Sequence, residues 1–166
     1  MKKKRVLIIL MISIVFGFAT GYSLHHWIHS ARFPEEKIML MPEHPFYLME
    51  EVNEEVLYNT LKHYDFPSPA IITAQAILES GNFKSKLCKD NNNLFGLYNS
   101  RTMSYFKFDS WISCVFAYKQ FILSRYDPEE DYYRFLDRIG YAEDSLYESK
   151  VKELELDIIN KYGSPD

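Results

Sequence analysis

The chain of 166 residues has room for one domain of ordinary size with one continuous core, which argues against several domains. Apolar residues make up 47% of it and aromatic residues 16%, a composition that excludes a largely disordered protein. The formal net charge is −4, and the basic residues at 2–5 all precede the first acidic residue, Glu35, so the remainder is more acidic still. Nucleic acid is therefore not an expected partner.

The N-terminal segment, residues 1–29, predicts a membrane anchor or an export signal. Residues 6–24 follow the basic cluster without a single charge, and this run is long enough to cross a bilayer as a helix. The best candidate cleavage site, at residues 19–21, matches the pattern for signal cleavage poorly, which favours an uncleaved transmembrane helix. In both cases we expect the domain in the cell envelope, anchored in the inner membrane and facing outward, or secreted if cleavage occurs.

The segment after the apolar run predicts a tether to one domain. Three histidines within residues 25–29 suit anchoring at the membrane interface better than a metal site, and we expect neither metal nor cofactor. Residues 30–45 carry three prolines without periodicity and predict a linker. The domain is expected over residues 46–162, followed by a tail at 163–166.

Two helices are expected at the start of the domain. Residues 46–64 show the spacing of an amphipathic helix with an acidic solvated face. Ser68 and Pro69 provide a cap and a first-turn proline, and Gly81 provides a stop, so residues 70–80 predict a short helix. This second helix is almost wholly apolar.

A small β insert and three more helices are expected next. Residues 94–108 carry aromatics on alternate positions around a turn at 99–100, which predicts a hairpin. Asp109 and Ser110 then cap a central helix that begins at Trp111. Two further helices are expected, at about residues 129–138 and 144–161. The pattern predicts a mainly α domain.

Cys88 and Cys114 form the one cysteine pair. In an oxidising envelope such a pair forms a disulfide when its geometry allows. The alternative is two small buried apolar side chains, and nothing in the sequence sets their separation in space.

The apolar helix carries one carboxyl group out of place. Ile72, Ala76 and Glu79 share a helix face, so Glu79 lies among aliphatic side chains in the last turn. Apolar surroundings and the negative end of the helix dipole both raise the pKa of a carboxyl group. A glycosidase's general acid requires this property. The alternative is a Glu79 that turns outward to water or to Lys84.

Two motifs around Glu79 carry a resemblance to a known family. Residues 74–81 read A-Q-A-I-L-E-S-G, and residues 92–97 read N-N-L-F-G-L. Together they resemble the glucosaminidase domain of glycoside hydrolase family 73, found in bacterial autolysins and flagellar peptidoglycan hydrolases. Residues 113–121 resemble its central helix, and residues 140–150 resemble its Y-A-x-D-x-x-Y-x-x-K segment. The resemblance runs from about residue 47 to about residue 162.

The resemblance implies a lysozyme-like α domain with a small β-hairpin lobe and a glycan cleft between them. Glu79 maps onto the family's catalytic glutamate, and Tyr141 maps onto a tyrosine that lines its active site. Asn93, Phe95 and Gly96 map onto a turn that shapes the cleft floor and contacts substrate.

The residues themselves leave the substrate contacts open. Asn93 in a turn usually satisfies nearby backbone groups rather than substrate. Phe95 fits a core as well as a sugar platform. Tyr118 is a candidate for stacking on a pyranose ring, with packing as the alternative.

The second catalytic group departs from the pattern of some family members. Those members use a carboxylate in the β lobe to activate water, yet no Asp or Glu lies between Asp90 and Asp109 here. Asp109 is the remaining candidate, although its place before a helix favours a capping role. Assistance by the substrate's own 2-acetamido group therefore gains weight, with Tyr141 orienting that group.

Three functions fit this pattern. The first is a peptidoglycan hydrolase, an endo-β-N-acetylglucosaminidase that cleaves the β-1,4 bond after N-acetylglucosamine with Glu79 as general acid. The second is a lytic transglycosylase, and the third is a non-catalytic wall-binding module. For each, the expected partners are peptidoglycan strands and, through the N-terminal helix, the membrane, and we expect a monomer.

Overall fold

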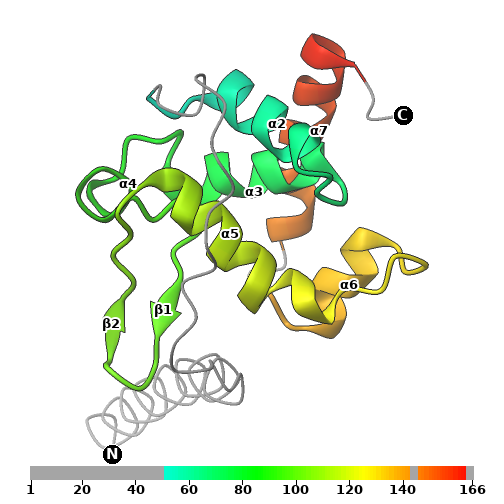
Figure 1. Ribbon diagram of the computed structural model, residues 1–166. Helices are drawn as coiled ribbons and strands as arrows, with labels where there is room; N and C mark the ends of the chain where they lie inside the picture. The colour runs from blue at the N-terminus through cyan, green and yellow to red at the C-terminus, as the bar shows by residue number, and fades with distance from the viewer. Residues whose placement is uncertain (1–50, 143–145, 164–166) are drawn as a thin grey trace, which may run out of the picture.

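The computed structural model describes residues 51–142 and 146–163 (Figure 1). In these residues the chain is mainly helical with a two-stranded antiparallel sheet, which confirms the predicted fold class at this level. The elements are α2 (Glu54–His63), α3 (Pro69–Ser80), α4 (Lys86–Asn91), β1 (Tyr98–Asn99), β2 (Ser104–Tyr105), α5 (Trp111–Phe121), the 3-10 helix η2 (Leu123–Arg125), α6 (Tyr132–Arg138) and α7 (Tyr147–Tyr162).

The predicted anchor at residues 1–29, including the apolar run at 6–24, lies outside the described residues, as does the linker at 30–45. Nor are residues 164–166 of the predicted tail described. Within 51–142 and 146–163, no helix combines the length and the apolar character needed to cross a membrane.

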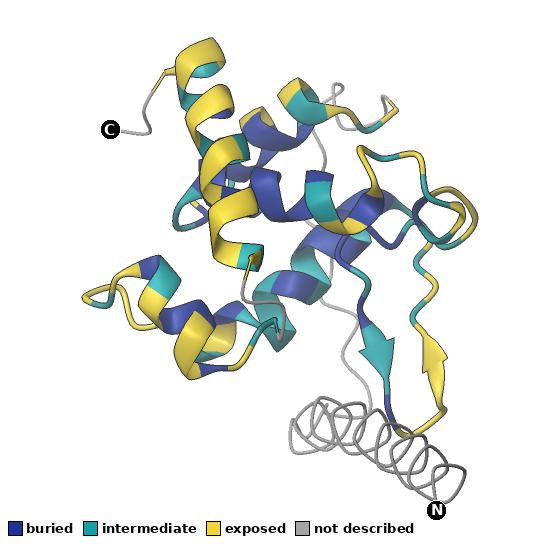
Figure 2. Ribbon diagram, turned by 180° about the vertical axis from the view of Figure 1, so that it is seen from behind, coloured by how far each residue is buried: buried dark blue, intermediate teal, exposed yellow. Residues whose placement is uncertain are grey.

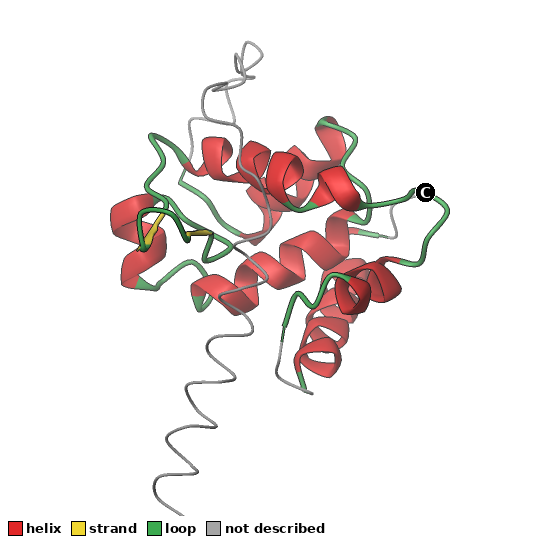
Figure 3. Cartoon of the chain, turned by 90° about the horizontal axis from the view of Figure 1, so that it is seen from below, coloured by secondary structure: helices red, strands yellow, loops and turns green. Residues whose placement is uncertain are grey.

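Helix α3 forms the centre of the core. Every residue from Pro69 to Ile77 is buried, which is why this helix is apolar on all sides (Figure 2). It packs against α7 and α2, and α5 crosses the molecule beside it (Figure 3). The predicted boundaries are confirmed to within one residue. Ser68 stands at the N-cap position, although its side chain makes no capping hydrogen bond.

Helix α2 is shorter than expected. The prediction began it at residue 46, whereas residues 51–53 are not helical and the helix begins at Glu54. Asn53 explains the start, because its side chain accepts a hydrogen bond of 3.0 Å from the Val56 N–H. The far end of α7 closes over α2, where the Tyr58 hydroxyl donates to the Gly163 carbonyl at 2.9 Å.

The β lobe is a small hairpin that projects from the helical body on the side away from α6 (Figure 1). Its strands are two residues each, shorter than the predicted 94–108, with Tyr98 opposite Tyr105. The rings of this pair meet edge-to-face at 5.2 Å. The Asn99 side chain accepts from the Arg101 N–H at 3.0 Å, which confirms a turn beginning there.

Two local features correct the sequence-based expectations. The short helix α4 was not predicted, and Ser85 caps it by accepting a hydrogen bond of 3.1 Å from the Cys88 N–H. The expected capping role of Asp109 is wrong for α5, because Ser110 is the cap and accepts from the Ser113 N–H at 3.2 Å. An N-cap residue needs an extended backbone one position before the helix, and Ser110 occupies that position.

The last two helices agree with the prediction in number. Helix α6 begins at Tyr132 rather than at residue 129, because the Asp131 side chain caps it by accepting from the Arg134 N–H at 3.0 Å. Helix α7 is described from Tyr147, and residues 143–145 before it lie outside the described chain.

Candidate active site

Glu79 lies where the buried helix α3 reaches the surface. Ile77 is buried, Leu78 is half-buried and Glu79 is exposed, so the helix emerges from the core within its last turn. Gly81 ends it in the left-handed conformation, with φ of +58°, and its N–H bonds back to the carbonyls of Ile77 and Leu78. The backbone thus presents one carboxyl group at the edge of an apolar core.

The surroundings of the Glu79 carboxyl favour its protonated form. Its side chain is open to solvent on one side, yet protein atoms crowd the carboxyl enough that desolvation raises its pKa. A hydrogen-bonding interaction with Tyr147 lowers the pKa by a smaller amount. Of the alternative in which Glu79 turns outward, the exposure of its side chain to water is present, whereas no ion pair with Lys84 is found in the described part of the chain.

Two tyrosines accompany this carboxyl. The Tyr141 ring lies 6.3 Å from the ring of Tyr118 and 5.7 Å from the ring of Tyr147. Burial raises the pKa of both Tyr141 and Tyr147, and the nearby Glu79 charge raises each further. Both phenols therefore stay neutral at ordinary pH and can serve as hydrogen-bond donors.

The turn after α4 passes beside Glu79. A Cβ atom placed on Gly96 would lie 3.9 Å from Glu79 Oε2, and Gly96 has a φ of +64°. The glycine thus permits the left-handed turn and leaves the space beside the carboxyl free of a side chain. Its neighbour Phe95 faces inward, where its ring packs 4.2 Å from the ring of Tyr118.

Asn93 holds this turn together. It is 1% exposed, its Nδ2 donates to the carbonyls of Leu97 at 2.8 Å and Phe106 at 3.0 Å, and its Oδ1 accepts from the Leu97 N–H at 2.9 Å. All of these partners belong to the turn and the hairpin base. The side chain therefore fixes the position of Gly96 next to Glu79.

The comparison with known families shows which family the chain belongs to. The profile of the Glucosaminidase family, described as mannosyl-glycoprotein endo-beta-N-acetylglucosaminidase, matches residues 55–163. The chain belongs to this glucosaminidase family. No curated protein and no solved structure gives a significant match to the chain. Membership of this family makes the domain a glycoside hydrolase, in general one that degrades peptidoglycan.

Tyr118 lies beneath the site of the glucosaminidase domain rather than on its surface. The residue is 0% exposed, and its hydroxyl donates to Gln75 Oε1 at 3.0 Å and lies 3.1 Å from the Tyr132 hydroxyl. A ring enclosed in this way supports its neighbours and does not present a face to a sugar.

Asp109, the remaining candidate for a second carboxylate, is exposed just before α5. Ser110 supplies the cap, which leaves Asp109 without that structural role. Among residues 51–142 and 146–163, no group of three His, Cys, Asp or Glu side chains is arranged to bind a metal ion.

Cys88 and Cys114 are both buried free thiols. The pair therefore matches the alternative of two small buried side chains and not a disulfide. Cys114 Sγ accepts a hydrogen bond of 3.3 Å from the Leu94 N–H, which ties α5 to the turn. Burial raises the pKa of Cys114 to about 12, so this thiol stays protonated.

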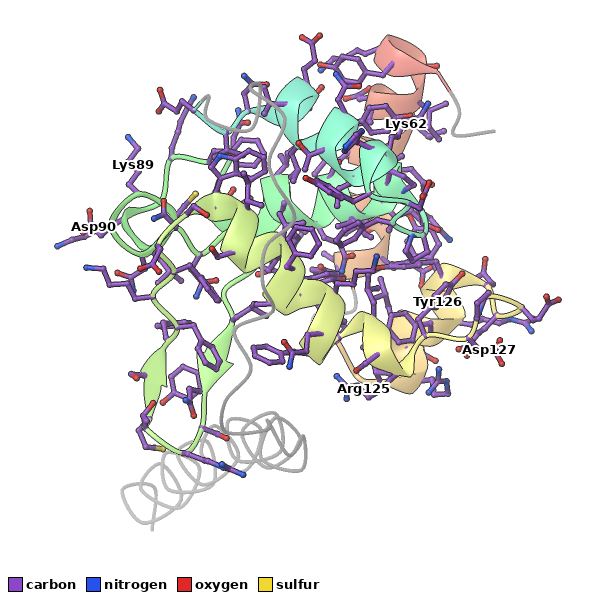
Figure 4. The ribbon with its side chains drawn as sticks, in the orientation of Figure 1. Lys62, Lys89, Asp90, Arg125, Tyr126 and Asp127 are labelled. Carbon is purple, nitrogen blue, oxygen red and sulfur yellow. The ribbon has the colours of Figure 1, made fainter. Side chains whose placement is uncertain are left out.

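Two residues of the candidate site were not among the sequence-based candidates. Tyr147 faces the Glu79 carboxyl, and Gln75 is buried one helical turn before Glu79. The available signals were the place of Tyr147 in the closing motif and the i, i+4 spacing of Gln75 and Glu79. Figure 4 shows side chains packed between α3, α5 and α7, whereas the charged Lys89 and Asp90 lie at the edge of the molecule.

Proposed function

We propose that the domain hydrolyses the β-1,4 bond after N-acetylglucosamine in peptidoglycan, with Glu79 as the general acid. One observation carries the proposal: a single carboxyl ends a buried apolar helix, desolvation raises its pKa, and two neutral phenols lie beside it. A carboxyl in this state holds a proton at a pH where an exposed glutamate is ionised.

The proposed mechanism begins with transfer of the Glu79 proton to the glycosidic oxygen. As the bond from C1 to that oxygen breaks, the carbonyl oxygen of the substrate's 2-acetamido group forms a bond to C1. Glu79, now ionised, then takes a proton from water as that water attacks C1 and releases the acetamido group. Substrate assistance is favoured because the β lobe has no Asp or Glu between Asp90 and Asp109, and Asp109 lies in the loop just before α5.

The remaining candidates take supporting places in this mechanism. We assign Tyr141 the role of orienting the acetamido group, since its phenol lies beside Glu79. Gly96 leaves open the space beside the carboxyl that a side chain would occupy, since a Cβ atom there would lie in van der Waals contact with Glu79 Oε2 at 3.9 Å. Asn93, Phe95 and Tyr118 act from beneath, as the residues that hold the Gly96 turn. The arrangement fits the lysozyme-like scheme of a helix-terminal glutamate next to a β lobe.

The location of the enzyme follows from its substrate. Peptidoglycan lies outside the cytoplasmic membrane, so the domain works in the cell envelope or after secretion. We propose the apolar run at residues 6–24 as its membrane anchor.

The test is identification of the ends that the full-length protein releases from purified sacculi. New reducing N-acetylglucosamine ends support the proposal, and 1,6-anhydromuramic ends identify a lytic transglycosylase instead. Absence of any release by the folded protein supports a wall-binding module. Glu79→Gln should abolish the release, whereas Glu153→Gln, which changes an exposed glutamate on α7, should not.

A further inference from the structure

A chain of buried hydrogen bonds runs from the core to the catalytic carboxyl. The Tyr132 and Tyr118 hydroxyls lie 3.1 Å apart, and Tyr118 donates to Gln75 Oε1 at 3.0 Å. Gln75 Nε2 donates to the Tyr147 hydroxyl at 3.2 Å, and Tyr147 faces Glu79. The chain joins α3, α5, α6 and α7, so it depends on the assembled tertiary structure.

The single proton of each hydroxyl gives this chain a direction. Tyr118 uses its proton on Gln75 Oε1, so the bond between the two phenols takes its proton from Tyr132. The Tyr147 oxygen receives a proton from Gln75 Nε2, so the proton of Tyr147 itself remains for Glu79. An amide has a donor at one end and an acceptor at the other, and Gln75 therefore sets the direction.

Burial opposes the reverse direction. Gln75 and Tyr118 are 0% exposed and Tyr132 is 3% exposed. With the amide reversed, the Tyr118 proton would have to go to Tyr132 or to Tyr141, and the phenol that received it would need another acceptor for its own proton. In the part of the chain that the structure describes, the hydroxyl of Tyr132 has Tyr118 as its hydrogen-bond partner. A buried hydroxyl proton without an acceptor is costly, so the observed direction is favoured.

We propose that Gln75 is a positioning residue that acts through Tyr147, keeping the Tyr147 proton directed at the Glu79 carboxyl so that the carboxylate formed after proton transfer is stabilised. The proposal rests on Glu79 being the general acid. It explains why a glutamine is buried inside the mostly apolar helix α3, and why Glu79 can release its proton although its surroundings favour retention. The lowering influence of Tyr147 on the pKa of Glu79 agrees with this direction.

The test measures the pKa of Glu79 by NMR titration of its carboxyl carbon, together with the pH–rate profile on sacculi. Gln75→Met and Tyr147→Phe should each raise the pKa of Glu79 by about 0.5 to 1 unit. The alkaline limb of the pH–rate profile should shift to higher pH by the same amount. The double variant should show no more than the shift of Tyr147→Phe alone, because Gln75 acts through Tyr147.

Tyr133→Phe is the matched control. It removes another tyrosine–glutamate hydrogen bond to α7, that of Tyr133 to Glu155 at 2.6 Å, without touching the chain under Glu79. The titration of Glu79 should not change in this variant. Thermal melts of all variants separate loss of folding from loss of positioning.

Several outcomes would overturn the proposal. A folded Gln75→Met whose Glu79 titrates as in the native protein would show that Gln75 only packs the core. Additive shifts in the double variant would show that the two residues act separately. If Gln75→Met does not fold, Tyr147→Phe decides alone, and an unchanged Glu79 titration rejects the idea. Because NMR needs no turnover, a protein without hydrolase activity would refute the proposed function and leave this measurement intact.

Discussion

Two buried polar clusters flank Glu79, and they end differently. Asn93 bonds to backbone groups of its own turn and of the hairpin base, and its Oδ1 also accepts from the neutral Cys114 thiol at 3.9 Å. The Gln75 cluster bonds to side chains from three other helices and ends at a carboxyl that solvent reaches. Hydrogen bonds that stay within the turn and its neighbours stabilise the turn. Hydrogen bonds that end at an exposed titratable group also affect how tightly that group binds its proton. The difference predicts that Asn93 matters first for stability and Glu79 first for activity.

The largest effect is expected from Glu79→Gln. The amide keeps the shape of the side chain but cannot donate the proton, so turnover on sacculi should fall by at least on the order of 10²-fold. In the native enzyme, activity should fall as the pH rises through the raised pKa of Glu79, because the acid form is then lost. A pH–rate profile with product quantification measures both. Retained turnover in Glu79→Gln would remove Glu79 from the role of acid.

The same variant should become more stable than the native protein as the pH rises. The folded-state pKa of Glu79 is raised, so the native protein loses stability as the pH increases from the unfolded pKa of glutamate through the folded value. Glutamine has no charge and avoids this loss. Melting temperatures of the two proteins should therefore coincide at low pH and diverge above it, with Glu79→Gln higher. A constant difference at all pH values would contradict the linkage.

Asn93→Ala should reduce stability more than it reduces activity. It leaves the Leu97 N–H and the carbonyls of Leu97 and Phe106 without their partner in a buried place. The free energy of unfolding should fall by about 3 kcal/mol, and the melting temperature by more than about 10 °C. Calorimetry checks this prediction. A fully stable Asn93→Ala with greatly weakened substrate binding would instead make Asn93 a substrate contact.

Gly96→Ala should combine a small loss of stability with a larger loss of activity. The left-handed backbone at φ of +64° costs an alanine about 1 kcal/mol. The new methyl group would lie 3.9 Å from Glu79 Oε2, where the substrate must approach. Gly163→Ala is the control, since it also has a positive φ, of +87°, but lies at the end of α7 with open space around it. Equal activity losses in both variants would argue against crowding at Glu79.

The smallest effect is expected from Asp109→Asn. Its side chain is exposed and Ser110 provides the helix cap, so stability should be unchanged and turnover should fall by less than about 3-fold. The assay is the same sacculus digestion. An Asp109→Asn enzyme as inactive as Glu79→Gln, yet equally well folded, would establish a two-carboxylate mechanism and exclude the role assigned to Tyr141.

Local signals account for the accuracy of the predicted elements. Pro69 and Gly81 bracket α3, and its boundaries were predicted to within one residue because both act through their own backbone conformation. Asn53 and Asp131 are equally good caps, but apolar spacing extended the predicted helices beyond them. The predicted hairpin lies at the right place in the chain, but its predicted strands are too long. Alternating aromatics indicate strand character without indicating where pairing stops.

For the site, the sequence by itself singled out Glu79 as an unusual carboxyl in an apolar helix, and motif resemblance added Tyr141 and Gly96. Only the tertiary structure brought Gln75 and Tyr147 together, since 72 positions separate them along the chain. It also decided that Tyr118 is buried and that Cys88 and Cys114 are free thiols. Helix ends and turns depend on residues that are neighbours in the sequence. The pKa of a carboxyl group depends instead on which helices, distant in the sequence, pack around it.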